Sequence, residues 1–144
     1  PMLGTSFVAT GEIHTSVLRL SVPVGLITVG ILHANNTRDM EQDTRANIRT
    51  FAMCIGKKWS VRIYCFEVLF PFFHIGGLVG AGLLPYWSFM VFVVMPVAFA
   101  NSSKVLRYPN EGMSAMVGID EKTAQLQLGF SMMLFISLMV AGLI

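Results

Sequence analysis

Four long apolar stretches, separated by polar segments, dominate the pattern of the chain. They cover residues 17–34, 59–84, 86–103 and 123–144. A helix needs about 20 residues to cross a hydrocarbon core of roughly 30 Å, so each stretch is about long enough to span a bilayer. The pattern therefore predicts an all-α transmembrane protein with four membrane-spanning helices.

Composition supports the membrane class. Of the 144 residues, 54% are hydrophobic and only 12% are charged, whereas about a quarter of the residues of an ordinary soluble domain are charged. The net charge of +2 is small. We therefore expect the lipid bilayer as the surroundings of the chain and no nucleic acid as a partner.

The basic residues are concentrated between the first two apolar stretches. Five of the ten lie there, Arg38, Arg45, Arg49, Lys57 and Lys58, and a sixth, Arg62, lies at the start of the second stretch. Positively charged loops next to membrane spans stay in the cytoplasm. With the loop between the first two spans in the cytoplasm, the remaining three spans cross the membrane in alternating directions, and the C-terminus is external.

A polar run, residues 35–43, begins where the first apolar stretch ends, and it contains candidate metal ligands. On a continuous helix Asn35, Asp39 and Asp43 lie four residues apart and line one face. Mg²⁺ prefers such oxygen ligands and is usually held by one or two carboxylates together with a substrate phosphate. The run therefore indicates a Mg²⁺ site for a diphosphate.

Arginines follow a neighbouring face of the same predicted helix. Arg38, Arg45 and Arg49 are spaced by seven and four residues, and arginine forks bind phosphate oxygens bidentately. An alternative interpretation is equally open on these residues alone: the arginines serve only membrane topology, and the acidic residues balance them in a solvated loop.

Two ionisable residues lie within the second stretch. Glu67 and His74 are seven residues apart, which places them on one helix face, where they either pair or line a cavity. His33, just before the polar run, is interpreted as a hydrogen-bonding residue at a helix end and is left outside the candidate site.

The run Asn35-Asn36-Thr37-Arg38-Asp39-Met40-Glu41-Gln42-Asp43, followed by Arg49-Thr50-Phe51-Ala52, resembles the second acidic motif of UbiA-type intramembrane prenyltransferases. Its Asn-Asn-x-Arg-Asp-x-x-x-Asp form is similar to that of the branch that prenylates 1,4-dihydroxy-2-naphthoate for menaquinone. Pro23-x-Gly25 in the preceding helix agrees with that branch.

The resemblance implies a bundle of nine transmembrane helices, of which residues 1–144 form the C-terminal part. Together with the spacing of the arginines, it implies the following roles: Asp39, Asp43 and Arg38 catalytic; Asn35, Asn36, Arg45 and Arg49 substrate-binding; Asp39, Asp43 and Asn35 ligands of Mg²⁺. Two departures stand out. Asn47-Ile48 replaces a frequent Gly-Lys, and the first acidic motif is absent, so these residues alone are expected to be inactive.

The function implied is transfer of a polyprenyl group from an allylic polyprenyl diphosphate to an aromatic acceptor. For the naphthoate branch the acceptor is 1,4-dihydroxy-2-naphthoate, and the product, formed with decarboxylation, is demethylmenaquinone. A bacterial plasma membrane is the expected location. Two alternatives remain: a family member with another acceptor, such as homogentisate, or a non-catalytic membrane subunit or transporter fragment.

Overall fold

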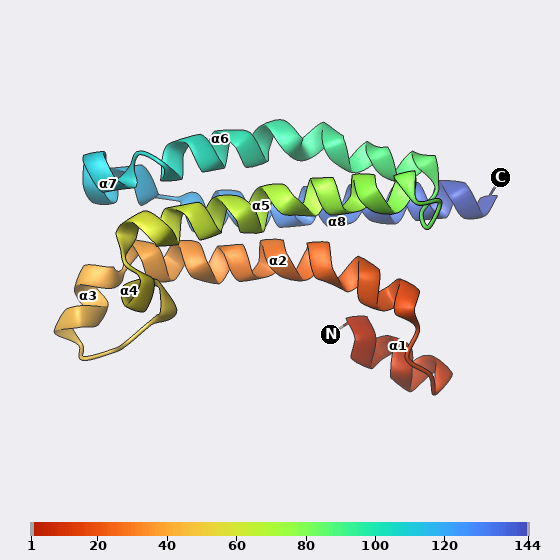
Figure 1. Ribbon diagram of the computed structural model, residues 1–144, viewed down its shortest axis with the longest axis horizontal. Helices are drawn as coiled ribbons and strands as arrows, with labels where there is room; N and C mark the ends of the chain where they lie inside the picture. Colours follow the sequence, from red (N-terminus) through yellow and green to blue (C-terminus); the bar gives the residue numbers. More distant parts are fainter. Residues whose placement is uncertain (1, 144) are drawn as a thin grey trace.

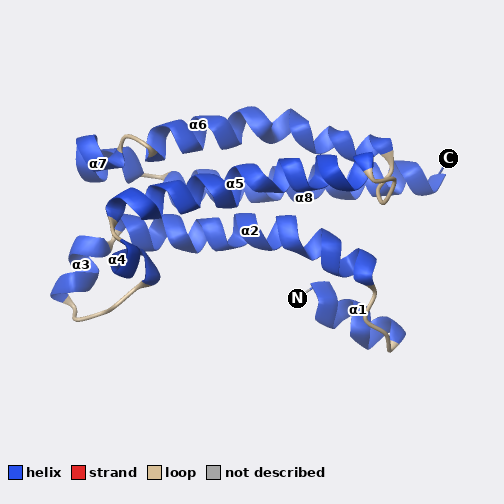
Figure 2. Ribbon diagram, viewed as in Figure 1, coloured by secondary structure: helices blue, strands red, loops and turns tan. Residues whose placement is uncertain are grey.

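Four long helical segments run side by side in the computed structural model, which describes residues 2–143 (Figure 1). Three are single α-helices: α2 (Thr15–Arg38), α5 (Lys57–Gly80) and α8 (Ile119–Leu143). The other joins η1 (Tyr86–Val94) to α6 (Met95–Val105). All four are long and apolar enough to cross a membrane. The described residues contain no strand, so the predicted all-α transmembrane class is confirmed (Figure 2).

Shorter helices lie at the two ends of this bundle (Figure 1). At one end, α3 (Met40–Arg45) and α4 (Phe51–Ile55) follow α2. Helices α7 (Tyr108–Glu111) and η2 (Gly112–Met116) lie at the same end. Helix α1 (Met2–Thr10) lies at the opposite end and packs against α2.

The centre of the bundle is apolar. Helix α2 packs on both α5 and α8, and α8 also packs on η1. The Phe72 ring meets Phe130 edge-on, with centroids 5.3 Å apart and planes at 90°, a favoured aromatic geometry. Large apolar side chains, including Phe73 and Phe135, are exposed on the outside, as they are on a surface that faces lipid.

The third span changes helix type at a proline. Pro96 has no N–H and cannot donate to the carbonyl four residues earlier. The Met95 N–H instead donates to the Phe92 carbonyl, three residues back, which is the 3₁₀ pattern. The third span is therefore a 3₁₀-helix in its first part, η1, and an α-helix in its second part, α6.

Three helix ends differ by about one turn from the boundaries predicted for the spans. Helix α2 continues to Arg38, α5 ends at Gly80 and α8 begins at Ile119. The early end of α5 has a local cause: Gly82 adopts a φ of 68°, and the Leu83 N–H donates to the Leu78 carbonyl, as in a Schellman motif. Ile144, the last residue of the predicted fourth span, lies outside the described residues.

Gly30 is the point of close approach between α2 and α5. A Cβ built there would lie 3.3 Å from Val68 Cγ1, whereas one at Gly25, on the same helix, would meet no atom within 4 Å. We expect Gly30→Val to lower the free energy of unfolding by about 1–3 kcal/mol through overpacking. Thermal unfolding in detergent would measure this, with Gly25→Val as the matched control. Equal effects of the two variants would contradict the prediction.

Candidate functional site

The polar run begins inside α2 and crosses a break in the helix. Helix α2 ends at Arg38, and α3 starts at Met40. Asp39 between them has φ −90° and ψ 5°, away from helical values. Hydrogen bonds still join the Asp39 N–H to the Asn35 carbonyl and the Asp43 N–H to the Asp39 carbonyl, at 3.0 and 2.9 Å. The prediction of one uninterrupted helix is therefore wrong, because the chain changes direction at Asp39.

Arg38 lies at the centre of what we call the arginine cluster: Asn35, Arg38, Asp39 and Asp120. Its Nε donates to Asp39 Oδ1 at 2.8 Å, and its Nη2 donates to Asp39 Oδ2 at 3.1 Å and to the amide oxygen of Asn35. Its Nη1 donates to Asp120 Oδ2 at 2.6 Å. The guanidinium thus joins the acidic motif to the first turn of α8.

Asp43 and the two remaining arginines make no side-chain bond to this cluster. Within residues 2–143, the side chains of Asp43, Arg45 and Arg49 make no hydrogen bond or ion pair; Asp43 is half-buried, and both arginines are exposed. Arg49 follows the end of α3, so the prediction that it continues the arginine face of one helix is wrong.

Asn47 explains why α3 ends. It adopts a φ of 54°, its N–H donates to the Thr44 carbonyl at 3.3 Å, and the Ile48 N–H donates to the Asp43 carbonyl at 2.9 Å. These bonds form a Schellman motif, in which the left-handed position is usually Gly and sometimes Asn. The Asn found where the family often has Gly therefore suits the same backbone turn.

The side chains of the polar run that could bind a metal ion would do so through oxygen atoms. The described residues contain no group of three or more His, Cys, Asp or Glu side chains placed to hold a metal. Asp39 and Asp43, with the amide oxygen of Asn35, do match the Mg²⁺ pattern of few protein carboxylates completed by substrate phosphate. The Asp43 carboxylate is free, while that of Asp39 is bound by Arg38.

A second polar group, which we call the buried histidine chain, connects α2 with α5. It consists of His33, Thr37, Ser60 and Glu67. His33 Nδ1 lies 2.9 Å from Glu67 Oε2, and Nε2 lies 2.9 Å from Ser60 Oγ. Ser60 Oγ in turn contacts Thr37 Oγ1. His33 and Glu67 are only 5% and 6% exposed, which makes an ionisable pair at this depth costly and a functional candidate.

One alternative for the ionisable residues of the second span, a pair between Glu67 and His74, is therefore wrong, whereas the other, that such a residue lines a cavity, holds for Glu67. Glu67 pairs with His33 and not with His74, whose Nε2 instead contacts the Arg19 carbonyl at 3.1 Å. His33 does form hydrogen bonds, as interpreted from the sequence, but it does so as a buried residue five positions before the end of α2. Glu67 and His74 share a helix face, but two helical turns separate them, which is farther than their side chains reach. Helix α2, which carries His33, packs directly against α5.

The hydrogens of the buried histidine chain can be placed by counting donors. Thr37 donates to the His33 carbonyl at 2.7 Å, so its oxygen accepts from Ser60, and Ser60 accepts from the His33 Nε2–H. One proton remains between His33 Nδ1 and Glu67 Oε2. Whether it rests on nitrogen or on oxygen, Glu67 Oε1 carries no proton and makes no hydrogen bond within residues 2–143.

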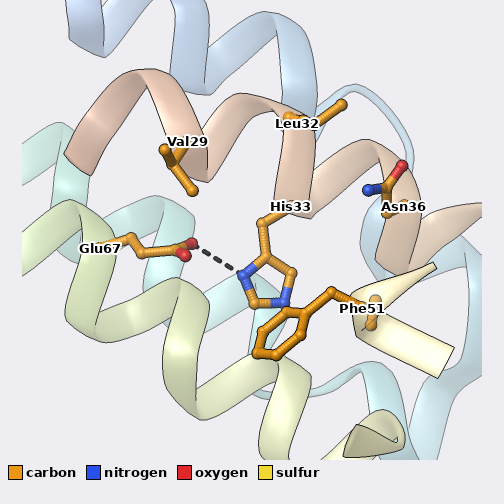
Figure 3. A pocket seen from close by; sticks show the side chains of 7 residues that line it. Val29, Leu32, His33, Asn36, Phe51 and Glu67 are labelled. Atoms are coloured by element: carbon orange, nitrogen blue, oxygen red, sulfur yellow. Dashed lines mark hydrogen bonds and ion pairs between the residues drawn. The ribbon is translucent and has the colours of Figure 1, made fainter. Parts of the chain in front are cut away.

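A cavity of about 160 Å³ adjoins this pair (Figure 3). Seven residues line it: Val29, Leu32, His33, Asn36, Phe51, Ala52 and Glu67. Phe51 comes from α4, and its ring meets the His33 imidazole edge-on at 5.9 Å. The wall is mainly apolar, with a few polar groups that converge on it, which is typical of sites for small molecules.

Sequence reasoning missed four residues of these groups: His33, Thr37, Ser60 and Asp120. One signal was available: a carboxyl group within a span needs a partner, and Glu67 has no basic residue within one turn of its own helix. His33 was thus a candidate partner from another span. Nothing local identified Asp120 as the partner of Arg38, 82 residues away in the chain.

Together, the apolar spans and the two polar groups at one end define an integral, multi-pass membrane protein with a candidate site between its helices. The model of the UbiA prenyltransferase family matches residues 1–124. The chain belongs to that family.

Curated relatives are similar over different parts of the chain. The 1,4-dihydroxy-2-naphthoate octaprenyltransferase of Bacillus subtilis is 27% identical over 135 residues, 94% of this chain and 43% of that protein. The UbiA prenyltransferase domain-containing protein 1 homolog of Drosophila melanogaster is 32% identical over 126 residues, 86% of this chain and 33% of that protein. The UbiA prenyltransferase domain-containing protein 1 of Gallus gallus is 43% identical over 65 residues, 45% of this chain and 20% of that protein. The chain thus spans less than half the length of these relatives. No solved structure matches it.

Proposed function

We propose that the protein is a Mg²⁺-dependent intramembrane prenyltransferase that transfers a polyprenyl group from an allylic polyprenyl diphosphate to an aromatic acceptor. The observation that carries this proposal is the position of the acidic motif. Asp39, Asp43 and Arg38 lie at the end of an apolar helix, so charged groups meet the diphosphate while the prenyl tail stays among apolar surfaces. Membership of the UbiA family supports the same reaction.

In this proposal the charges act on the leaving group. Asp39 and Asp43, with Asn35, would hold Mg²⁺, which when bound would supply positive charge to a diphosphate leaving group. Arg38 stabilises the negative charge that develops there, and such electrostatic contributions are usually the largest in catalysis. Asn36, Arg45 and Arg49 bind the diphosphate from the surrounding chain; both arginines are exposed and free to turn toward it.

For the acceptor we propose 1,4-dihydroxy-2-naphthoate, with loss of CO₂ to give demethylmenaquinone. The form of the acidic motif and the similarity to the Bacillus subtilis protein support this choice. The proposed orientation places the acidic motif in the cytoplasm and the C-terminus outside, in a bacterial plasma membrane. Similarity to the animal proteins named UbiA prenyltransferase domain-containing protein 1 supports a second candidate, a different aromatic acceptor.

Metal removal tests the reaction class. With membranes containing the protein expressed from its natural reading frame, dihydroxynaphthoate and a polyprenyl diphosphate, we expect a chelator to abolish product formation and added Mg²⁺ to restore it. The reason is that Asp39 and Asp43 cannot by themselves neutralise a diphosphate. Mass spectrometry of the extracted quinones measures the product. Undiminished product in the chelator would contradict the proposal, and prenylation of another acceptor alone would overturn only the naphthoate assignment.

A further inference from the structure

We propose that the cavity beside the buried histidine chain binds a hydroxylated aromatic ring, with Glu67 Oε1 accepting a hydrogen bond from the ring hydroxyl. This inference rests on the proposed function, because it assigns the acceptor substrate to a place in the chain. Glu67 would be a substrate-binding residue, and His33 a positioning residue that acts through it.

Size and lining of the cavity suit one aromatic ring system. Its volume is about 160 Å³, and an apolar cavity of about 150 Å³ is large enough for benzene. Val29, Leu32 and Ala52 provide apolar contacts, and the Phe51 ring stands at its edge (Figure 3). A second ring or a substituent of the ligand would extend through the open side of the cavity.

Glu67 provides the only carboxyl group among the residues that line the cavity. Its Oε2 is occupied by His33, which leaves Oε1 as an acceptor of hydrogen bonds. An accessible acceptor in a mainly apolar wall favours a ligand that donates a hydrogen bond to it. A phenolic hydroxyl has this chemistry, whereas a prenyl chain does not.

The position of His33 is held from both sides. Ser60 binds its Nε2, and Phe51 covers one edge of its ring. The imidazole therefore keeps the Glu67 carboxyl in one orientation relative to the cavity. A fixed carboxyl orientation lets the site recognise a ring hydroxyl by the direction of its hydrogen bond.

The cavity also lies beside the acidic motif. Asn36 lines it, and Asp39 follows three residues later, which places Asp39 about one turn further along the same side of the helix. From His33 to Asp39 the rise is about 9 Å for six helical residues. A ring in the cavity would thus lie near the first carbons of a prenyl group whose diphosphate is bound at Asp39.

Binding of two probes tests the inference directly. Dissociation constants of 1,4-dihydroxy-2-naphthoate and its 1,4-dimethoxy analogue are measured, without oxygen, for the purified protein from its natural reading frame. We expect the wild type to prefer the dihydroxy probe by about tenfold to hundredfold, because the methyl ethers cannot donate to Glu67. Glu67→Met should bind both probes equally. Glu67→Gln, which keeps an uncharged acceptor, should retain part of the preference. Glu111→Gln, an exposed site, is the control.

The ratio of the two constants separates recognition from folding. A purely structural role of Glu67 would weaken both probes together and leave the ratio unchanged, and that result would overturn the inference. If Glu67→Met does not fold, Glu67→Gln decides, with an expected fall in preference of at least about threefold. Product formation, measured in parallel, reports on the proposed function. If the wild type forms product but the Glu67 variants keep its preference for the dihydroxy probe, only the proposed site is refuted. If the Glu67 variants lose that preference but the wild type forms no product, only the proposed reaction is refuted.

Discussion

Replacing Asp39 with Asn is expected to lower prenyl transfer about 100- to 1000-fold at saturating Mg²⁺ and substrates. The substitution keeps the size of the side chain and removes its charge. Asp39 is the residue where α2 gives way to α3, and its two oxygens bind the Arg38 guanidinium. Loss of the charge therefore weakens a proposed metal ligand and the partner of a proposed phosphate ligand, and contributions of this electrostatic kind are worth about two to three orders of magnitude in rate.

Initial rates of product formation, measured by mass spectrometry in reconstituted membranes, provide the test. Glu41→Gln is the matched control, because Glu41 is an exposed carboxylate of the same motif that pairs with Lys57 at 3.3 Å. Its rate should stay within about twofold of wild type, as expected for an exposed pair. If Asp39→Asn retained a rate similar to that of Glu41→Gln, the assignment of Asp39 would be wrong.

Asp43→Asn distinguishes the two aspartates. The Asp43 carboxylate has no side-chain partner within the described residues, whereas Asp39 is tied to Arg38. Both variants should lose activity, but only Asp39→Asn should also lower the melting temperature. Thermal unfolding in detergent, run on the same preparations, measures this difference.

Arg38→Gln is expected to lower turnover by about 100-fold and to reduce stability by about 1–3 kcal/mol. The guanidinium supports three acceptors at once: the Asn35 amide, the Asp39 carboxylate and the Asp120 carboxylate. Its loss removes a stabilising charge from the proposed leaving group. It also leaves two part-buried carboxylates without their partner, which carries the cost of an unsatisfied charged group.

Arg38→Lys should not rescue the activity. A lysine has one point-like ammonium and no planar fork, so it cannot reproduce the two bonds to Asp39 together with the bond to Asp120. Kinetics at varied prenyl diphosphate would show the defect in both Lys and Gln variants. Full activity of Arg38→Lys would contradict a role that depends on the geometry of the guanidinium.

The ion pair between Arg38 and Asp120 of α8 can be tested separately with a matched pair of variants. Asp120→Asn removes the negative charge of one of the three acceptors, while Glu121→Gln changes the next residue of α8, which is exposed and makes no ion pair with Arg38. We expect a loss of about 1 kcal/mol for the first variant and no change for the second. Indistinguishable melting temperatures would show that the link between α2 and α8 does not contribute to stability.

The sequence determined the helical class and the positions of the spans, because both depend on local properties. An α-helix satisfies its backbone hydrogen bonds within its own segment, and about 20 apolar residues are enough to identify a span. The same local reasoning placed Asn35, Asp39 and Asp43 at the end of α2. Their spacing indicated a Mg²⁺ site for a diphosphate, and the resemblance of the motif supplied the prenyl-transfer reaction.

Only the tertiary structure decided which polar groups meet. His33 and Glu67 are 34 residues apart, and Arg38 and Asp120 are 82 apart. Whether such residues touch depends on which helix faces pack together, and in an apolar bundle many rotations of a helix bury similar surface. The close approach at Gly30 brings α5 against α2, and that contact, with the turn at Asn47 that ends α3, positions the candidate site.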